Sequence, residues 1–341
     1  MSDDRQMLDG AIAPVSNTQL FGHEDAEAFL AHSYKSGKGH HAILIEGAEG
    51  IGKATLAFRF SNHVLSYPDP ANAPDAISDP NPEAPVSRQL ASGASHNLLH
   101  LTRPVDEKTG KVKSAITIDE VRRAGRFFSQ TSGTDSWRIV IIDPADDLNR
   151  NAANAILKIL EEPPKRAMFL VISHAPGKLL PTIRSRCQPL RLSPLGDDNL
   201  LRSLDNLGLT LDGGKTRETV LSMSKGSVAR ALKLLNYGGV DIVGAFDAVL
   251  AANGPAATKA MHNLADILSA KESDVVFTFF LEHLGDHLID RARQFAMDGE
   301  IASADRIARL SSEIVEKITV SQAYNLDRKQ TILSVMEAVR I

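Results

Sequence analysis

The chain has 341 residues, of which 38 are Lys or Arg and 42 are Asp or Glu, so its formal net charge is −4. At about 150 residues per domain, this length predicts two or three domains with enough chain to bury a core. Hydrophobic residues make up 43% and charged residues 23%, which excludes an intrinsically disordered protein. The slight acidic excess argues against a chain that binds nucleic acid by itself through a large basic surface.

The N-terminus and the cysteine content favour a protein of the reducing cytoplasm. The first ten residues, MSDDRQMLDG, are acidic and polar, unlike a secretory signal or transit peptide. No apolar run approaches the roughly 18 residues that a membrane helix needs, so we expect no membrane contact. The single cysteine, Cys187, excludes an internal disulfide and an all-cysteine zinc site.

From residue 42 to about residue 195, short apolar runs alternate with helical patterns. The runs cover residues 42–45, 139–142 and 168–172 and are typical of strands buried on both faces. Between the second and third runs, apolar residues recur at helical spacing until Pro163-Pro164 ends the helix. A strand, a helix and another strand form a right-handed crossover in a parallel sheet, so this region is an α/β domain.

The remaining stretches differ in character. Residues 67–85 contain six prolines and no apolar period, which predicts a long loop, either a functional insertion or a degenerate one. After residue 195 the pattern is helical, first over 200–207 and 217–235, and then from 245 to the end, with amphipathic stretches over 275–295 and 301–318. We therefore predict three domains, covering residues 1–195, 196–240 and 241–341.

Residues 47–53 read Gly-Ala-Glu-Gly-Ile-Gly-Lys, directly after the first predicted strand and before a helix. This is the GxxxxGK pattern in the strand–loop–helix setting that a phosphate-binding loop requires. Its glycines let successive N–H groups point at a phosphate beside a helix N-terminus. These glycines are Gly47, Gly50 and Gly52. The alternative is a glycine-rich turn that only joins a strand to a helix.

The end of this loop departs from a working Mg²⁺-nucleotide site. Lys53 has the position that reaches the outer phosphates of a nucleotide. The next residue usually supplies a hydroxyl to Mg²⁺, but here it is Ala54. Thr55 lies about 100° further round the helix and does not substitute for it. ATP or ADP binding stays open, and we expect Mg²⁺ binding to be weak or absent.

The run 139–142 ends at Asp143, where a Walker B strand delivers a carboxylate to the metal. In ATP-hydrolysing members of the large ring ATPase class, the following position carries a second carboxylate. Here that position is Pro144. Asp146 and Asp147 come next, and we expect them to cap the following helix rather than to act in catalysis. The missing hydroxyl and the missing base both predict a site that does not hydrolyse ATP.

For two minor patterns we favour an interpretation without metal or DNA binding. His96 and His100 have the i, i+4 spacing that can bind zinc on one helix, but no other ligands accompany them, so we expect no metal. Residues 108–113 form a small basic turn, which we interpret as a solvated hairpin tip rather than a DNA contact, because no aromatic residue lies within it.

Three segments resemble the clamp-loader subgroup of the AAA+ ATPases. The most specific is Asn-Ala-Ala-Asn-Ala-Ile-Leu-Lys-Ile-Leu-Glu-Glu-Pro-Pro at 151–164, and Ser185-Arg186-Cys187 matches the SRC motif of that subgroup. The resemblance is strong over residues 14–195, where Ile-Thr-Ile-Asp-Glu-Val-Arg at 116–122 also fits. It implies a P-loop AAA+ domain with a parallel sheet, a small helical lid domain over 196–240 and an all-α collar domain over 241–341.

The resemblance also implies roles for particular residues. In this family the SRC arginine acts in trans on ATP held by a neighbouring subunit, which makes Arg186 a candidate arginine finger. The alternative is that Arg184 and Arg186 are solvated loop residues. Cys187 would be a buried apolar residue of the motif rather than a nucleophile.

Two further positions correspond to nucleotide sensors of the family. Arg230 lies in Gly-Ser-Val-Ala-Arg at 226–230, which resembles the sensor 2 helix of the lid, where it would face the phosphates of a nucleotide in its own chain. The alternative is an exposed helix arginine. Ser173-His174 falls near sensor 1, and a turn is an equally good interpretation of these two residues.

The family usually carries a four-cysteine zinc module after its first helix, and this chain has no cysteine there. The loop at 67–85 resembles a remnant or replacement of that module. The implied partners are the gamma/tau motor subunits and a delta subunit in a hetero-oligomeric ring, with the sliding clamp and primer-template DNA contacted through the complex. We expect a polymerase-holoenzyme subunit that is not an ATPase by itself; the alternatives are an ATP-hydrolysing motor subunit, another AAA+ ATPase, or a nucleotide-sensing interaction protein.

Overall fold

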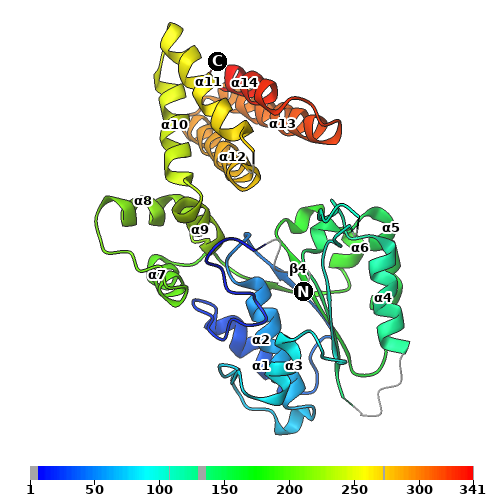
Figure 1. Cartoon of the computed structure of the whole chain (residues 1–341). Helices are drawn as coiled ribbons and strands as arrows, with labels where there is room; N and C mark the ends of the chain where they lie inside the picture. Colours follow the sequence, from blue (N-terminus) through cyan, green and yellow to red (C-terminus); the bar gives the residue numbers. More distant parts are fainter. Residues whose placement is uncertain (1–6, 107, 130–135, 272, 341) are drawn as a thin grey trace. The chain divides into compact units, whose positions relative to one another are not determined.

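The computed structural model describes residues 7–106, 108–129, 136–271 and 273–340 (Figure 1). The chain divides into two compact units, Met1–Ala229 and Arg230–Ile341. The predicted boundaries at 195 and 240 therefore stay a proposal, since helices on both sides of residue 195 belong to the first unit.

The first unit is built on a five-stranded sheet in the order β2-β3-β4-β1-β5. All neighbouring strands are parallel, as predicted from the buried apolar runs. The strands are β1 (Ala42–Glu46), β2 (Leu98–Leu101), β3 (Arg138–Ile142), β4 (Ala167–Ser173) and β5 (Gln188–Arg191). Every residue of β1 and β4 is buried, because helices cover both faces of the sheet.

Helices pack on the two faces of the sheet in separate layers (Figure 1). On one face, alternate strand residues such as Ile45 and Leu170 form a core with α1 (Glu24–Lys35) and α2 (Lys53–Ser66). On the other face, Leu44 and Phe169 pack with α4 (Ile118–Ser129) and α5 (Arg150–Glu161). The predicted helix between the second and third runs is thus confirmed as α5, which makes the crossover between β3 and β4.

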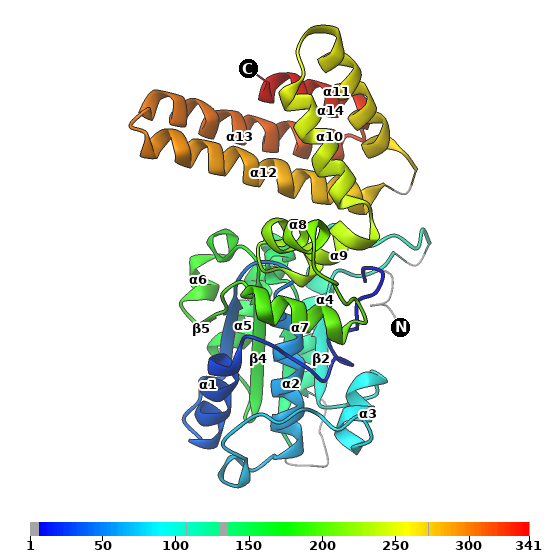
Figure 2. The same ribbon diagram turned by 90° about the vertical axis from the view of Figure 1, so that its left-hand side faces the viewer.

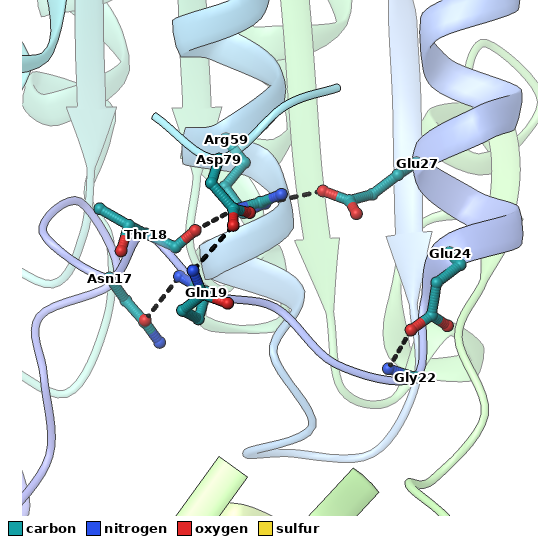
Figure 3. A network of polar contacts seen from close by, with 8 residues as sticks. All are labelled: Asn17, Thr18, Gln19, Gly22, Glu24, Glu27, Arg59 and Asp79. Atoms are coloured by element: carbon teal, nitrogen blue, oxygen red, sulfur yellow. Dashed lines mark hydrogen bonds and ion pairs between the residues drawn. The ribbon is translucent and has the colours of Figure 1, made fainter. Parts of the chain in front are cut away.

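The proline-rich segment 67–85 is an ordered strap between α2 and α3 (Pro85–Ala91), with a short 3₁₀ turn, η2 (Pro70–Asn72). A polar network holds it to the domain (Figure 3). Arg59 is only 3% exposed; its Nε donates to Glu27 at 2.7 Å and its Nη1 donates to Asp79 of the strap at 2.8 Å. The same Nη1 also donates to the carbonyl of Thr18, and Gln19 donates to the other oxygen of Asp79 at 2.8 Å.

The basic turn after β2 is a hairpin, as predicted. Val105 and Val112 form an antiparallel bridge, and Lys111 contributes its carbonyl to the N–H of Asp106. The Asp106 carboxylate accepts hydrogen bonds from the backbone N–H groups of Lys108 and Thr109 at the tip. These backbone N–H groups therefore find their hydrogen-bond acceptors within the turn itself.

Five further elements complete the first unit before α9. They are η3 (Ala145–Asp147) between β3 and α5, η4 (Pro176–Lys178) and α6 (Pro181–Arg184) between β4 and β5, and α7 (Asp197–Asn206) and α8 (Lys215–Ser224) after β5. The helical pattern predicted over 217–235 forms two helices. Lys225 and Gly226 have positive φ values of 49° and 73°, so α8 ends there and α9 (Val228–Asn236) begins separately.

The second unit is all-helical over its described residues. After the last turns of α9 it contains α10 (Gly239–Ala251), α11 (Gly254–Ser269), α12 (Asp274–Met297), α13 (Ile301–Ala323) and α14 (Arg328–Val339). The long helices α12 and α13 lie side by side (Figure 2) and confirm the predicted amphipathic stretches. Among the described helices none could cross a membrane singly; only the pair α9 and α10, bent by 83°, meets the length and composition required.

Candidate nucleotide site

The carboxyl edge of the sheet brings together the predicted loop and the acidic strand end. Residues 47–52 follow β1, Asp143 follows β3, and Ser173 ends β4, which lies between those two strands. Because all three strands are parallel, their carboxyl ends meet at one edge, where ligands of open α/β sheets bind. The use of these residues as a nucleotide site stays a prediction.

The loop is held from one side by the first turn of α9. The N–H of Val228 donates to the Gly50 carbonyl at 2.9 Å, and the Ser227 hydroxyl donates to the Glu49 carbonyl at 2.8 Å. Gly50 has φ +74°, and a Cβ there would lie 2.3 Å from the Cβ of Ala229. Glycine at this position therefore serves close packing on the start of α9.

The N-terminal segment closes the other side of the loop. His23 is buried, and its Nε2 donates to the Ile51 carbonyl at 2.7 Å. Burial lowers the pKa of His23, so the ring is a neutral donor near pH 7. Gly52 has φ +103°, and a Cβ there would lie 2.8 Å from Leu20.

Lys53 turns into the loop. Its side chain is 3% exposed, and its Nζ donates to the carbonyls of Gly47, at 2.7 Å, and Ala48. Burial lowers the pKa of Lys53 to about 8, although the negative charge of Asp143 opposes this shift.

We expect a pH signature from Lys53. Below pH 8 the folded and unfolded states both carry the charge, and burial of that charge costs about 3 kcal/mol. Between pH 8 and about 10.5 the folded state releases its proton first, so stability should rise with pH through this window. Urea unfolding of the wild type and of Lys53→Met at pH 7.5 and 9.5 tests this. A rise of the same size in both proteins would contradict the assignment.

The acidic strand end is occupied by neighbours within the chain. His100 Nε2 lies 3.6 Å from a carboxylate oxygen of Asp143. His100 belongs to β2, and His96 precedes that strand, so the two histidines do not lie one turn apart on a helix. Among the described residues no cluster of three or more His, Cys, Asp or Glu side chains could hold a metal ion.

The prediction that Asp146 and Asp147 cap the following helix is wrong. Asn149 caps α5, with its side chain accepting from Ala152 N at 2.9 Å. The 3₁₀ turn η3 aims Asp146 at the end of β4, where its carboxylate accepts from the Ser173 hydroxyl at 2.9 Å. The same carboxylate accepts from two backbone N–H groups, those of residues 174 and 175. Asp147 instead lies 3.1 Å from the guanidinium of residue 103, and burial raises its pKa.

The residues at the two predicted sensor positions, Ser173-His174 and Arg230, lie among other side chains of this chain. Ser173 is committed to Asp146, while Nδ1 of His174 is buried without a hydrogen-bond partner among the described residues. Burial lowers the pKa of His174, and the charge of Lys53 lowers it further. Arg230 lies in the second unit, 2.5 Å from Asp286 of α12. A nucleotide contact of either position stays a prediction.

The side chains around the loop do not match those that hold a metal-bound nucleotide. Lys53 is satisfied by loop carbonyls, and Ala54 has no hydroxyl. Thr55 is buried in α2, and Asp143 has His100 beside it. The residues present therefore do not fit a bound Mg²⁺-nucleotide in the arrangement that hydrolysis requires.

Arg186 lies at the amino-terminal ends of the strands, whereas residues 47–53 lie at their carboxyl-terminal ends. It lies two residues before the start of β5, whose residue Gln188 pairs with Ile43 of the parallel strand β1. The loop begins after the carboxyl end of β1, so about 15 Å of strand separates the two positions. The guanidinium is about one-third exposed, lies 2.5 Å from Glu161 and donates to the Thr182 carbonyl at 2.9 Å.

The next residue of this motif behaves as predicted. Cys187 is 7% exposed and packs in the core on the α5 side of the sheet. Burial raises the pKa of its thiol to about 12, which makes it unreactive at neutral pH.

The parallel sheet, the glycine-rich loop after β1 and the acidic end of β3 define a P-loop domain of the AAA+ class. The family model described as "DNA polymerase III, delta subunit" matches residues 22–196, just over half of the chain, and the chain belongs to this family.

Relatives agree with the family. The chain is 34% identical over 203 residues to DNA polymerase III subunit delta' of Pseudomonas aeruginosa, covering 58% of this chain and 56% of that one. It is 30% identical over 169 residues to the subunit of the same name from Escherichia coli, covering 48% and 46%. The chain spans about half the length of these relatives. A solved gamma subunit-related protein of Thermotoga maritima covers 91% of this chain at 16% identity, with a TM-score of 0.45.

Proposed function

We propose that this chain is a non-hydrolysing subunit of a clamp loader and donates Arg186 to the ATP site of a neighbouring motor subunit. The observation that carries the proposal is the position of Arg186 at the amino edge of the sheet, away from residues 47–53 of its own chain. A guanidinium at that edge reaches a nucleotide only in another subunit. There it stabilises the negative charge of the transferring phosphoryl group.

The state of the chain's own loop supports the non-hydrolysing part of this role. Lys53 is bound by Gly47 and Ala48, and neither Ala54 nor Pro144 can supply the missing hydroxyl or base. Such a subunit supplies an arginine to the ATP site of a neighbour while its own nucleotide site stays inactive.

The partners follow from the family and from the exposed apolar residues of the second unit. We infer a hetero-oligomeric ring with gamma/tau motor subunits and a delta subunit, which loads a sliding clamp onto primed DNA in the cytoplasm. The helices over 241–341 would form the collar. Val315 and Tyr324 of this unit are 62% and 74% exposed, and such side chains are suited to burial between subunits.

ATP turnover by the purified chain tests the non-hydrolysing assignment. We expect turnover at background level, because the site lacks both Mg²⁺ hydroxyl and base. Turnover well above background would instead identify a motor ATPase. Saturable binding of a fluorescent nucleotide without turnover, lost in Lys53→Ala, would favour a nucleotide-sensing interaction protein.

A further inference from the structure

The first unit has a cavity of about 210 Å³ at the amino edge of the sheet. It lies among the end of α1, the loop leading into β1, the start of β4 and the beginning of the proline-rich strap. Its apolar walls are Tyr34, Ile43, Phe60, Trp137 and Met168. The mechanism proposed above uses none of these residues.

The aromatic side chains that line the cavity are held in place, because their polar atoms already make hydrogen bonds. Tyr34 Oη donates to the carbonyl of Tyr67 at 2.6 Å, and Trp137 Nε1 donates to the carbonyl of Pro68 at 3.0 Å. The rings of Tyr34 and Trp137 meet edge to face, 5.6 Å apart. The start of the strap therefore holds the aromatic walls in place and leaves an apolar interior.

The size of the cavity limits what it can hold. An apolar cavity of roughly 150 Å³ is enough to bind benzene, whereas drug-sized ligands occupy about 300 Å³ or more. A cavity of 210 Å³ suits a single aromatic side chain. Burial of such an anchor is the usual centre of a peptide-binding site.

The positive charge at the rim of the cavity comes from Arg166. His40 and His41 also line the rim, and their rings stack 4.5 Å apart. Burial lowers the pKa of His41, so this ring is neutral near pH 7. The loops that carry these residues also contain Lys38 and Lys165. A basic rim round an apolar interior complements an apolar anchor with acidic neighbours.

Arg166 adopts a backbone conformation that is uncommon for its residue type, with φ +54°. Its carbonyl accepts from Arg138 N at 2.8 Å, which ties this turn to β3. Strained non-glycine residues concentrate at ligand sites, where a particular side chain is needed in spite of its backbone.

We propose that this cavity binds an acidic peptide segment of a partner protein, with an aromatic side chain seated between Tyr34, Phe60 and Trp137 and carboxylates at Arg166. A nucleic acid base fits less well. Tyr34 and Phe60 are 4% and 1% exposed, so they form walls and not the open stacking platforms that bases require.

Fluorescence anisotropy with the full chain and a labelled peptide Glu-Asp-Phe-Glu-Asp tests the proposal. We expect saturable binding that weakens at least tenfold when alanine replaces the phenylalanine of the peptide, and that weakens with salt. Equal binding of the two peptides would overturn the proposal. Displacement of the peptide by a dT oligonucleotide would overturn it as well.

Arg166→Gly separates a binding role from a structural one. Glycine adopts a positive φ without a Cβ penalty, so the melting temperature should stay equal or rise while peptide affinity falls at least fivefold. Lys225→Gly is the matched control, since Lys225 also has a positive φ, of 49°, and is not among the lining residues. It should leave peptide binding unchanged. Undiminished binding by Arg166→Gly would contradict the assignment of the rim.

Discussion

In a clamp loader reconstituted with its motor subunits, Arg186→Ala is expected to slow ATP hydrolysis at the neighbouring site by about 10³-fold. The reason is the loss of a rigid, permanently charged group at the transferring phosphoryl. The ring itself should still assemble, because the collar helices would hold it together. Single-turnover hydrolysis by the complex with primed DNA and clamp measures this effect, and size-exclusion chromatography measures assembly.

Arg184→Ala is the matched control for this experiment. Arg184 is exposed and lies two residues earlier, at the end of α6. Its loss removes the same charge from the same surface and should leave hydrolysis close to the wild-type rate. Arg186→Lys should restore little activity, because an ammonium lacks the planar fork of a guanidinium. Wild-type hydrolysis by the Arg186→Ala complex would show that this residue is not the arginine finger.

The proposed role of Arg186 requires its guanidinium to leave Glu161, its partner in the structure. The two side chains are about one-half and one-third exposed, and ion pairs exposed to this degree contribute little. Glu161→Gln should therefore leave hydrolysis by the complex within a few-fold of wild type. A loss as large as that of Arg186→Ala would mean that Glu161 orients the guanidinium in the ring.

The parts of the fold predicted from sequence are those with a strong local pattern. β1, β3 and β4 are continuous apolar runs because helices bury both of their faces. The edge strands β2 and β5 were not predicted. β5 reads Gln-Pro-Leu-Arg with alternating burial, and a proline within four residues is tolerated only at a sheet edge.

The candidate site likewise has a part that the sequence predicts and a part that it does not. The spacing in residues 47–53 predicted the loop and its place in the fold, because the pattern is local. The contacts that hold the loop are not local: Ser227 and Glu49 are 178 residues apart in sequence. The inward turn of Lys53 and the partner of Asp146 likewise depend on tertiary packing, which no spacing rule records.

The role of the proline-rich strap was also beyond reach of the sequence pattern. Its composition predicted a loop, but its attachment depends on Arg59, which lies in an otherwise apolar part of α2. Arg59 bridges Glu27 of α1 and Asp79 of the strap (Figure 3), so three elements meet at one buried guanidinium.

Arg59→Met is expected to destabilise the first unit by about 3–5 kcal/mol, the cost of removing one partner from a buried ion pair. Methionine keeps most of the side-chain volume, so the loss reports the charge and its hydrogen bonds rather than a cavity. Lys35→Met is the matched control. It removes the pair between Lys35 and Asp75, which also joins α1 to the strap but is exposed, and it should change stability little. Urea unfolding measures both variants.

The pH dependence of the Arg59→Met deficit identifies Glu27 as the group left without its partner. Burial raises the pKa of Glu27 even in the wild type, where Arg59 opposes the shift. Without Arg59 this pKa rises further, so the folded variant holds a proton that the unfolded chain has released. Because the folded state then binds more protons, the stability of the variant should rise as pH falls from 8 toward 5, and its deficit should shrink. A deficit that stays constant over this range, or equals that of Lys35→Met, would mean that the strap is held by its packing and not by the buried charges.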